Sequence, residues 1–82
     1  MKMEVINTKS LGRMIRQHRK SIGLTQRDAA GLCGVGERFL SELERGKETA
    51  SLGKAIQVIK RLGMKIEIKG ALPVLRGVDE LD

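Results

Sequence analysis

The amino-acid sequence predicts a mainly α-helical domain of four short helices, followed by one short β-strand and a C-terminal tail. Two patterns predict this fold. Apolar residues recur at helical spacing in four segments, and over residues 64–69 they change to strict alternation with charged residues. The 82 residues are enough for one hydrophobic core. We therefore expect one folded domain over residues 1–70 and a flexible acidic tail over residues 71–82.

The first predicted helix begins at Thr8 or Lys9 and ends at Ser21, before Gly23. One side of it carries residues at helical spacing, with Ile22 following: Leu11, Met14, Ile15 and His18. We expect Met14 to lie in the core. No cysteine or carboxylate cluster accompanies His18, so we expect a packed or hydrogen-bonded histidine and no metal ligand.

Residues 24–47 predict two further helices joined by a tight glycine turn, which is the outline of a helix-turn-helix. Thr25 is a suitable N-cap, and Asp28 can return a hydrogen bond to the Thr25 backbone N–H, so the helix begins at Gln26. Gly34 can adopt the left-handed conformation that ends a helix. The turn covers residues 34–36, and the next helix ends at Gly46.

The packing side of these two helices is indicated by small and apolar residues. Ala29 and Ala30 are small enough for two helices to cross closely, and the following helix has an apolar side formed by Phe39, Leu40 and Leu43. The one cysteine of the chain, Cys33, has no metal or redox partner nearby in the sequence. We expect it to be a small buried hydrophobic residue.

The fourth predicted helix has Ser51 as its N-cap and ends at Gly63. Its apolar stripe comprises Leu52, Ala55, Ile56, Ile59 and Leu62. The strand follows directly, and a lone strand leaves backbone groups unpaired. We expect it to pair with residues 2–6 or with the same strand of a second subunit. A thin aliphatic core with Phe39 as its one aromatic residue favours a homodimer.

The chain carries a net charge of +6 and has a pI near 10.0. Three acidic residues and no basic ones lie in residues 77–82, so the first 76 residues carry +9. Basic residues crowd the first third of the chain: Lys9, Arg13, Arg16, Arg19, Lys20 and Arg27. Such a domain suits a polyanion, and with a helix-turn-helix the polyanion expected is double-stranded DNA. RNA is less well supported, because surface aromatic residues for base stacking are missing.

Other classes of function find little support in the sequence. No nucleophile stands beside a base, no glycine-rich loop could cradle a phosphate and no set of metal ligands is present, so we expect no enzyme, catalytic residue, cofactor or metal. The first ten residues lack the apolar region of a secretory signal, and no apolar run reaches membrane-spanning length. We expect a cytoplasmic protein that does not bind a membrane.

Particular residues of this motif resemble the phage-repressor-like (Xre-type) helix-turn-helix family over residues 9–63. They are Thr25, Gln26, Ala30, Gly34, Val35 and the run LERGK at residues 43–47. Ala29 departs from the leucine usual in that family. Most such domains continue into a fifth helix; the direct passage from the fourth helix to a strand resembles HipB-type antitoxins, whose dimers pair such strands. The family resemblance also implies that Arg19 pairs with Glu44 as a structural contact.

In a helix-turn-helix, the second helix lies in the major groove with its N-terminal residues against base edges. The corresponding positions are Gly36, Glu37, Arg38 and Ser41. Arg38 can donate two hydrogen bonds to guanine O6 and N7, and Glu37 can accept one from cytosine N4, which favours a half-site containing G·C. Glu37 is equally explained as a charge that complements the helix dipole. Gly36 has no side chain with which to read a base.

Phosphate contacts are expected at the two ends of the motif, from Gln26, Arg27, Arg45 and Lys47. We interpret the chain as a dimeric, sequence-specific transcriptional regulator of an inverted-repeat operator. The HipB resemblance implies an antitoxin that represses its own operon and neutralises a HipA-like kinase toxin, with the acidic tail on the toxin or serving only solubility. The alternative is a stand-alone Xre-type repressor.

Overall fold

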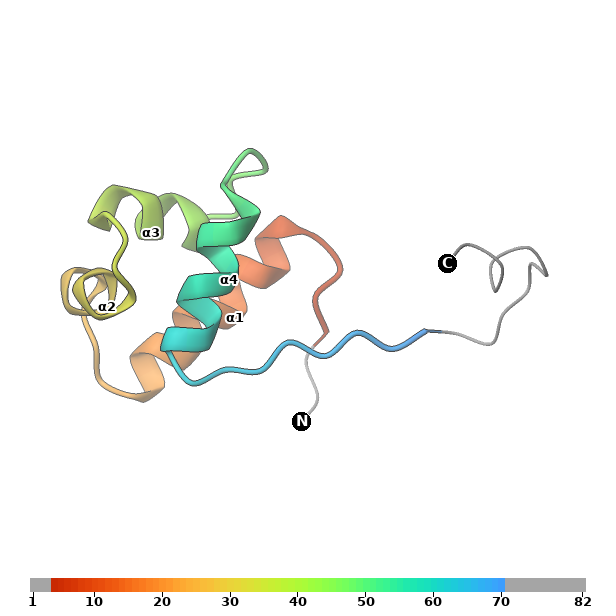
Figure 1. Ribbon diagram of the computed structural model, residues 1–82, viewed down its shortest axis with the longest axis horizontal. Coiled ribbons are helices and arrows are strands. Elements are labelled where there is room, and N and C mark those ends of the chain that lie inside the picture. Colours follow the sequence, from red (N-terminus) through yellow and green to blue (C-terminus); the bar gives the residue numbers. More distant parts are fainter. Residues whose placement is uncertain (1–3, 71–82) are drawn as a thin grey trace.

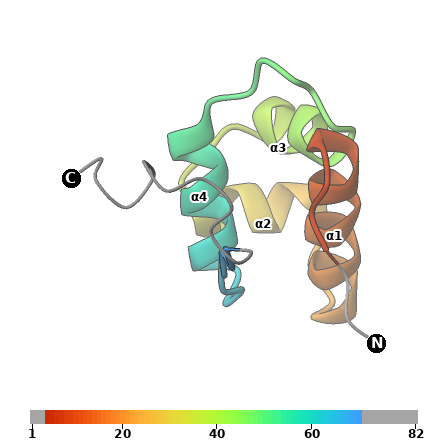
Figure 2. The ribbon, with the colours of Figure 1, turned by 90° about the vertical axis from the view of Figure 1, so that its right-hand side faces the viewer.

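The computed structural model describes residues 4–70, which contain four α-helices (Figure 1). They are α1 (Thr8–Ser21), α2 (Gln26–Cys33), α3 (Glu37–Glu44) and α4 (Leu52–Arg61). Figure 2 shows α1 and α4 on opposite sides, with α2 and α3 between them. α3 packs against α1 and α2, and α4 packs against α2. The four predicted helices are confirmed.

Local capping interactions account for the positions of the helix ends. Asn7 Oδ1 accepts a hydrogen bond from the Ser10 backbone N–H at 2.8 Å, and Ser10 Oγ accepts one from the Asn7 N–H, so α1 begins with a capping box. Thr25 Oγ1 caps α2 by accepting from the Asp28 N–H at 3.0 Å. The expected return bond from the Asp28 carboxylate is not formed, so that part of the prediction was wrong.

The hydrophobic core draws on all four helices. It contains Ile15, Ala29, Ala30, Cys33, Leu40, Leu43, Ala55, Val58, Ile59 and Leu62. Cys33 is completely buried, as expected, and the desolvation of its thiol raises the pKa. The Nε2 atom of His18 lies 2.7 Å from the Leu62 carbonyl oxygen, which confirms a hydrogen-bonded histidine.

The predicted core was wrong at several positions of α4 and at one position of α1. Leu52, placed in the apolar stripe of α4, is 71% exposed, whereas Val58, left out of it, is completely buried. Residues 55, 58, 59 and 62 form the side of α4 that meets the core, whereas Leu52, in the first turn, and the half-buried Ile56 lie outside the core cluster. Met14 is only half-buried and lies outside the core cluster, because α1 turns that position toward the edge of the packed face.

Gly12 allows α1 to lie directly against the C-terminal end of α3. A Cβ atom at this position would lie 2.4 Å from the Glu44 carbonyl oxygen and 2.5 Å from the Leu43 carbonyl oxygen. Any other residue would force the two backbones apart. The absence of a side chain at Gly12 therefore sets the spacing between α1 and α3.

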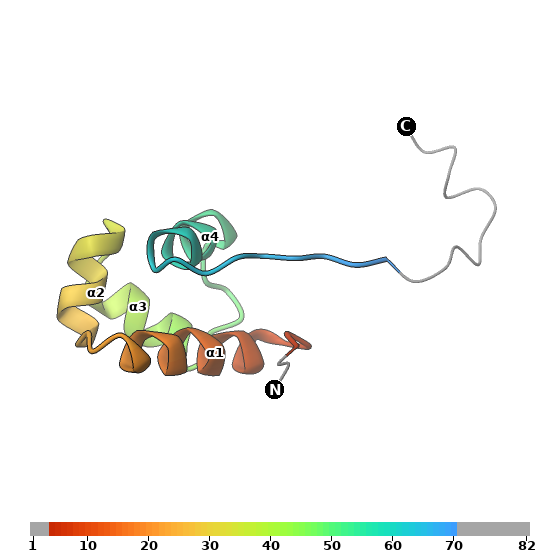
Figure 3. The ribbon, with the colours of Figure 1, turned by 90° about the horizontal axis from the view of Figure 1, so that it is seen from below.

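Residues 64–70 leave α4 as an extended segment that points away from the helices (Figures 1 and 3). Residues 4–70 contain no β-strand, so the expected strand is not confirmed, and residues 4–6 provide no paired partner for it. Pairing with a second subunit stays a prediction. The predicted tail, residues 71–82, lies outside the described residues. Within residues 4–70, every helix is too short or too polar to cross a membrane.

Candidate nucleic-acid interface

The turn between α2 and α3 holds α3 with its N-terminal end outward. Gly34 adopts the left-handed conformation, with φ 72°, and the Val35 N–H donates to the Ala30 carbonyl at 3.0 Å. Leu40 and Leu43 are buried on the inner side of α3. This anchoring leaves the opposite side of α3 accessible from its first turn onward.

The exposed side of α3 carries three of the predicted base-contacting side chains. Glu37 and Arg38 are exposed, and Ser41 is half-buried one turn further along. The Arg38 side chain is 92% exposed, so nothing in residues 4–70 covers it. Gly36 is the N-cap of α3, and its carbonyl accepts a hydrogen bond from the Leu40 N–H at 3.1 Å. Arg27 is exposed in the first turn of α2.

Glu42 links two of the predicted DNA contacts. Its Oε2 atom lies 3.7 Å from Nε of Arg38, and its Oε1 atom accepts a hydrogen bond from Lys47 Nζ at 3.1 Å. That hydrogen bond, aided by the positive charges of Lys47, Arg38 and Arg45 and opposed by desolvation, lowers the pKa of the Glu42 carboxyl. The carboxylate stays ionised and lies between the two cations, Arg38 in the first turn of α3 and Lys47 beyond its C-terminal end.

A buried ion pair fixes the helix-turn-helix to α1. Arg19 donates to the Glu44 carboxylate through Nε at 2.6 Å and through Nη2 at 2.9 Å, and its Nη1 donates to the Leu24 carbonyl. Both side chains are buried, and the hydrogen bonds to Glu44 raise the pKa of Arg19. The pairing implied by the family resemblance is confirmed.

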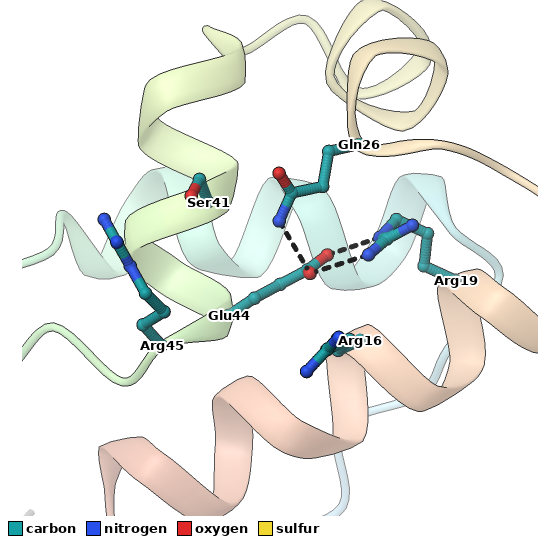
Figure 4. Close-up of a pocket in the computed structure, with 6 residues that line it drawn as sticks. All are labelled: Arg16, Arg19, Gln26, Ser41, Glu44 and Arg45. Carbon is teal, nitrogen blue, oxygen red and sulfur yellow. Dashed lines mark hydrogen bonds and ion pairs between the residues drawn. The ribbon is translucent and has the colours of Figure 1, made fainter.

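The Gln26 side chain is held by the same carboxylate. Its Nε2 atom donates to Glu44 Oε1 at 3.0 Å (Figure 4), so this predicted phosphate contact is half-buried and oriented by α3. This bond could not be predicted from the sequence, because the two residues are 18 positions apart and no periodic pattern connects them. A phosphate near Gln26 would meet an amide whose orientation is already set.

A hollow of about 370 Å³ opens between α1, α2 and α3 around this carboxylate (Figure 4). Its lining is polar and comprises Arg16, Arg19, Gln26, Ser41, Glu44 and Arg45. It brings together three predicted site residues: Gln26 of α2, Ser41 of α3 and Arg45, the C-cap of α3. Arg16 was not among the predicted site residues. In the sequence it is one of several basic residues in the first third of the chain, and no motif assigns it to the interface.

The structure therefore forms two groups from the predicted site residues. Gln26, Ser41 and Arg45 surround the hollow, while Arg38 and Lys47 flank Glu42. Arg27, Gly36 and Glu37 belong to neither group. Residues 4–70 contain no cluster of three or more histidine, cysteine or acidic side chains able to hold a metal ion.

Comparisons with known proteins agree with this geometry. Residues 2–70 match a helix-turn-helix domain family. The chain is 47% identical over 58 residues to the uncharacterised HTH-type transcriptional regulator y4mF of Sinorhizobium fredii, covering 71% of this chain and 76% of that protein.

Solved structures of HipB share the fold. A HipB variant in complex with an O2 20mer superposes with a TM-score of 0.78 at 17% identity, covering 87% of this chain and 99% of that one. The HipA–HipB–O2–O3 complex gives a TM-score of 0.75 at 16% identity, covering 82% and 94%. The chain thus belongs to the helix-turn-helix domain family, as an HTH-type transcriptional regulator with the fold of HipB.

Proposed function

We propose that the protein is a dimeric repressor that reads an inverted-repeat operator through α3. The observation that carries this proposal is the exposed Arg38 at the start of a helix whose other side is anchored by buried Leu40 and Leu43. A helix held in this way can enter the major groove without loss of core packing.

Arg38 is the principal base-reading residue in this proposal. Glu42 lies beside its Nε atom, which leaves the two terminal nitrogens free to donate to guanine O6 and N7. Glu37 can accept from cytosine N4, and Ser41 lies one turn further along the same side. At Gly36 the absence of a side chain lets the end of α3 approach the bases closely.

The phosphate contacts lie on both sides of the reading helix. Gln26 and Arg27 occupy the first turn of α2, where backbone N–H groups have no partner within the helix. Arg45 and Lys47 follow α3 at its other end. These contacts would set the position of α3 along the groove without reading the sequence.

A second subunit would pair with the extended segment after α4. Residues 64–69 alternate between apolar and charged residues, and Ile66 and Ile68 are 49% and 90% exposed in the single chain. Pairing of these segments about a two-fold axis would satisfy their backbone groups and cover both isoleucines. The two reading helices would then lie about 34–36 Å apart, which fits half-sites about 10 bp apart.

The partner proposal goes one step further, to a HipA-like kinase toxin that the protein neutralises while repressing its own operon. It is supported by the HipB fold and by the solved HipA–HipB–O2–O3 complex, whose matched chain has that fold. A stand-alone repressor is equally compatible with the fold. In either case residues 1–70 would bind DNA and form the dimer, and residues 71–82 would be a separate tail.

Paired substitutions test the reading role of Arg38. Arg38→Ala should cost about 1–3 kcal/mol on the preferred site and remove discrimination at one base pair of each half-site. Lys47→Ala should weaken binding to all sequences alike and lower the salt dependence. Site selection from a random duplex library, followed by binding titrations, measures both effects. An unchanged base preference in Arg38→Ala would exclude Arg38 as a reader.

A further inference from the structure

The outer side of α1 carries a line of basic residues that the helix-turn-helix itself does not use. Lys9, Arg13, Arg16 and Lys20 follow one another at spacings of four, three and four. At 3.6 residues per turn they lie within about 60° of one another around the helix axis. We call these four residues the α1 stripe.

All four residues of the α1 stripe are exposed, and none forms an ion pair within residues 4–70. α1 contains no acidic residue that could neutralise them. Arg19 shows the contrast, because it lies on another side of α1 and is buried against Glu44. The α1 stripe is therefore an uncompensated line of positive charge.

Two contacts place the α1 stripe on the α3 side of the domain. Arg16 lines the same hollow as Ser41 and Arg45 (Figure 4). At the N-terminal end of α1, Lys9 lies so close to Gly46 that a Cβ on Gly46 would be 2.7 Å from the Lys9 Cα. Gly46 stands between the two proposed phosphate contacts Arg45 and Lys47, so the α1 stripe continues their positive surface.

The hollow beside Arg16 is suited to an anion. The charges of Arg19 and Glu44 offset each other at its base, while Arg16 and Arg45 form no ion pair within the described residues. A phosphodiester at its mouth would meet two guanidinium groups, each able to donate two parallel hydrogen bonds. Such an arrangement favours a phosphate over a single carboxylate of an acidic protein.

We propose that the α1 stripe is a second phosphate-binding surface, which extends the contact of each subunit onto the DNA backbone flanking the half-site. This inference rests on the proposed function and adds a surface to it. From Lys9 to Lys20 the helix rises about 16 Å, a length that corresponds to roughly five base pairs at 3.4 Å each. DNA is the partner favoured, since the line continues from the end of the reading helix.

The salt dependence of DNA binding by the full-length protein tests this surface. The double variant Arg13→Gln/Arg16→Gln is compared with Lys60→Gln/Arg61→Gln, which removes the same charge from exposed positions at the end of α4. For the stripe variant, the slope of log K against log salt should fall by about 0.9 per lost phosphate contact, or about 1.8 in total. The loss should be equal on the selected site and on an unrelated duplex. The α4 variant should keep a slope near that of the wild type.

Two further measurements make the result specific. Arg16→Lys keeps the charge and should retain most of the slope, and removing the flanking base pairs from the duplex should abolish the difference between stripe variant and wild type. Equal slopes for stripe variant and wild type would overturn the inference, as would equal losses in the two double variants. Loss of an acidic protein partner with no change in slope would also overturn it.

Different results would contradict the proposed function and the α1 stripe. If the wild-type protein selects no site at all, the repressor proposal itself is wrong. If it selects a site and depends on Lys47 while the stripe variant behaves as wild type, only the α1 stripe is excluded.

Discussion

Glu44 connects three helices through one buried carboxylate. It accepts two hydrogen bonds from Arg19 of α1 and one from Gln26 of α2, and it is itself the last residue of α3. A buried charge is tolerated only when it is paired and hydrogen-bonded. The orientation of α3 therefore depends on this residue, whose buried carboxylate lies at the base of the hollow.

We predict that Glu44→Gln lowers the free energy of unfolding by about 3 kcal/mol, because Arg19 is left buried without its countercharge while the amide oxygen still accepts one hydrogen bond. Urea unfolding followed by circular dichroism measures the change. Glu48→Gln, at an exposed loop position, is the control and should stay within about 0.5 kcal/mol of the wild type. Equal effects of the two substitutions would show that the ion pair does not anchor the motif.

The residues of the candidate site were predictable where the chemistry is local to the motif. Arg38 and Ser41 follow from their positions at the start of the second helix, and the Arg19–Glu44 pair follows from the family resemblance. The bond from Gln26 to Glu44 and the place of Arg16 beside Arg45 were not predictable. Both depend on how α1 and α2 pack against the end of α3. The spacing of residues within one helix does not predict that packing.

At the scale of elements, helix ends were predicted well because capping is decided within four or five residues. Thr25, Gly34 and Ser51 act as expected. The choice of core positions in α4 was less accurate, since both Leu52 and Val58 are apolar and only the contact with α2 decides between them. The Asn7–Ser10 capping box was missed because its N3 residue is serine, not the glutamate or glutamine of the usual pattern.

The contact between α1 and α3 gives a prediction with an internal control. Gly12→Ala should destabilise the domain by about 1–3 kcal/mol, because the new methyl group meets the backbone carbonyls of Leu43 and Glu44. Gly31→Ala, inside α2 with nothing within 4 Å of the added atom, should stabilise it by about 0.5–1 kcal/mol. Thermal unfolding of both variants measures whether each substitution lowers or raises the stability of the domain. A neutral Gly12→Ala would mean that α1 can move away from α3 at little cost.

At the scale of the whole molecule, residues 64–70 are the part that the sequence of one chain defines least. Their alternating pattern predicts a strand, but a strand needs hydrogen-bonding partners from elsewhere, and residues 4–70 of a single chain supply none. Local patterns predicted the helices because each helix satisfies its own backbone. The same reasoning explains why a second subunit is the proposed partner.

The dimer proposal predicts that Ile66→Pro yields monomers, because proline removes a backbone donor from the middle of the paired segment. Sedimentation at micromolar concentration measures the mass, and binding to the inverted repeat should weaken in parallel. Ile66→Val keeps the backbone donor and a β-branched side chain, so it should remain dimeric. A wild-type protein that sediments as a monomer would contradict the two-fold arrangement of reading helices.

The composition of residues 71–82 is relevant to the proposed protein partner. They contain three acidic residues and several apolar residues, with Arg76 as their one basic residue. The domain before them is basic. On a HipA-like kinase, such a segment could place leucine and valine side chains in pockets and its carboxylates against basic groups, with the cost of ordering limiting the affinity.

We predict that the full-length protein retains a HipA-like kinase in a pull-down from its native host, and that truncation after Gly70 releases it. The full-length protein and the truncated protein are both tagged, and mass spectrometry identifies the proteins that each one retains. Operator binding by the truncated protein is the control for its folding. Retention by both would keep the antitoxin role and assign the contact to residues 1–70. No kinase on either protein, with operator binding intact, would leave a stand-alone repressor whose regulation rests on DNA recognition alone.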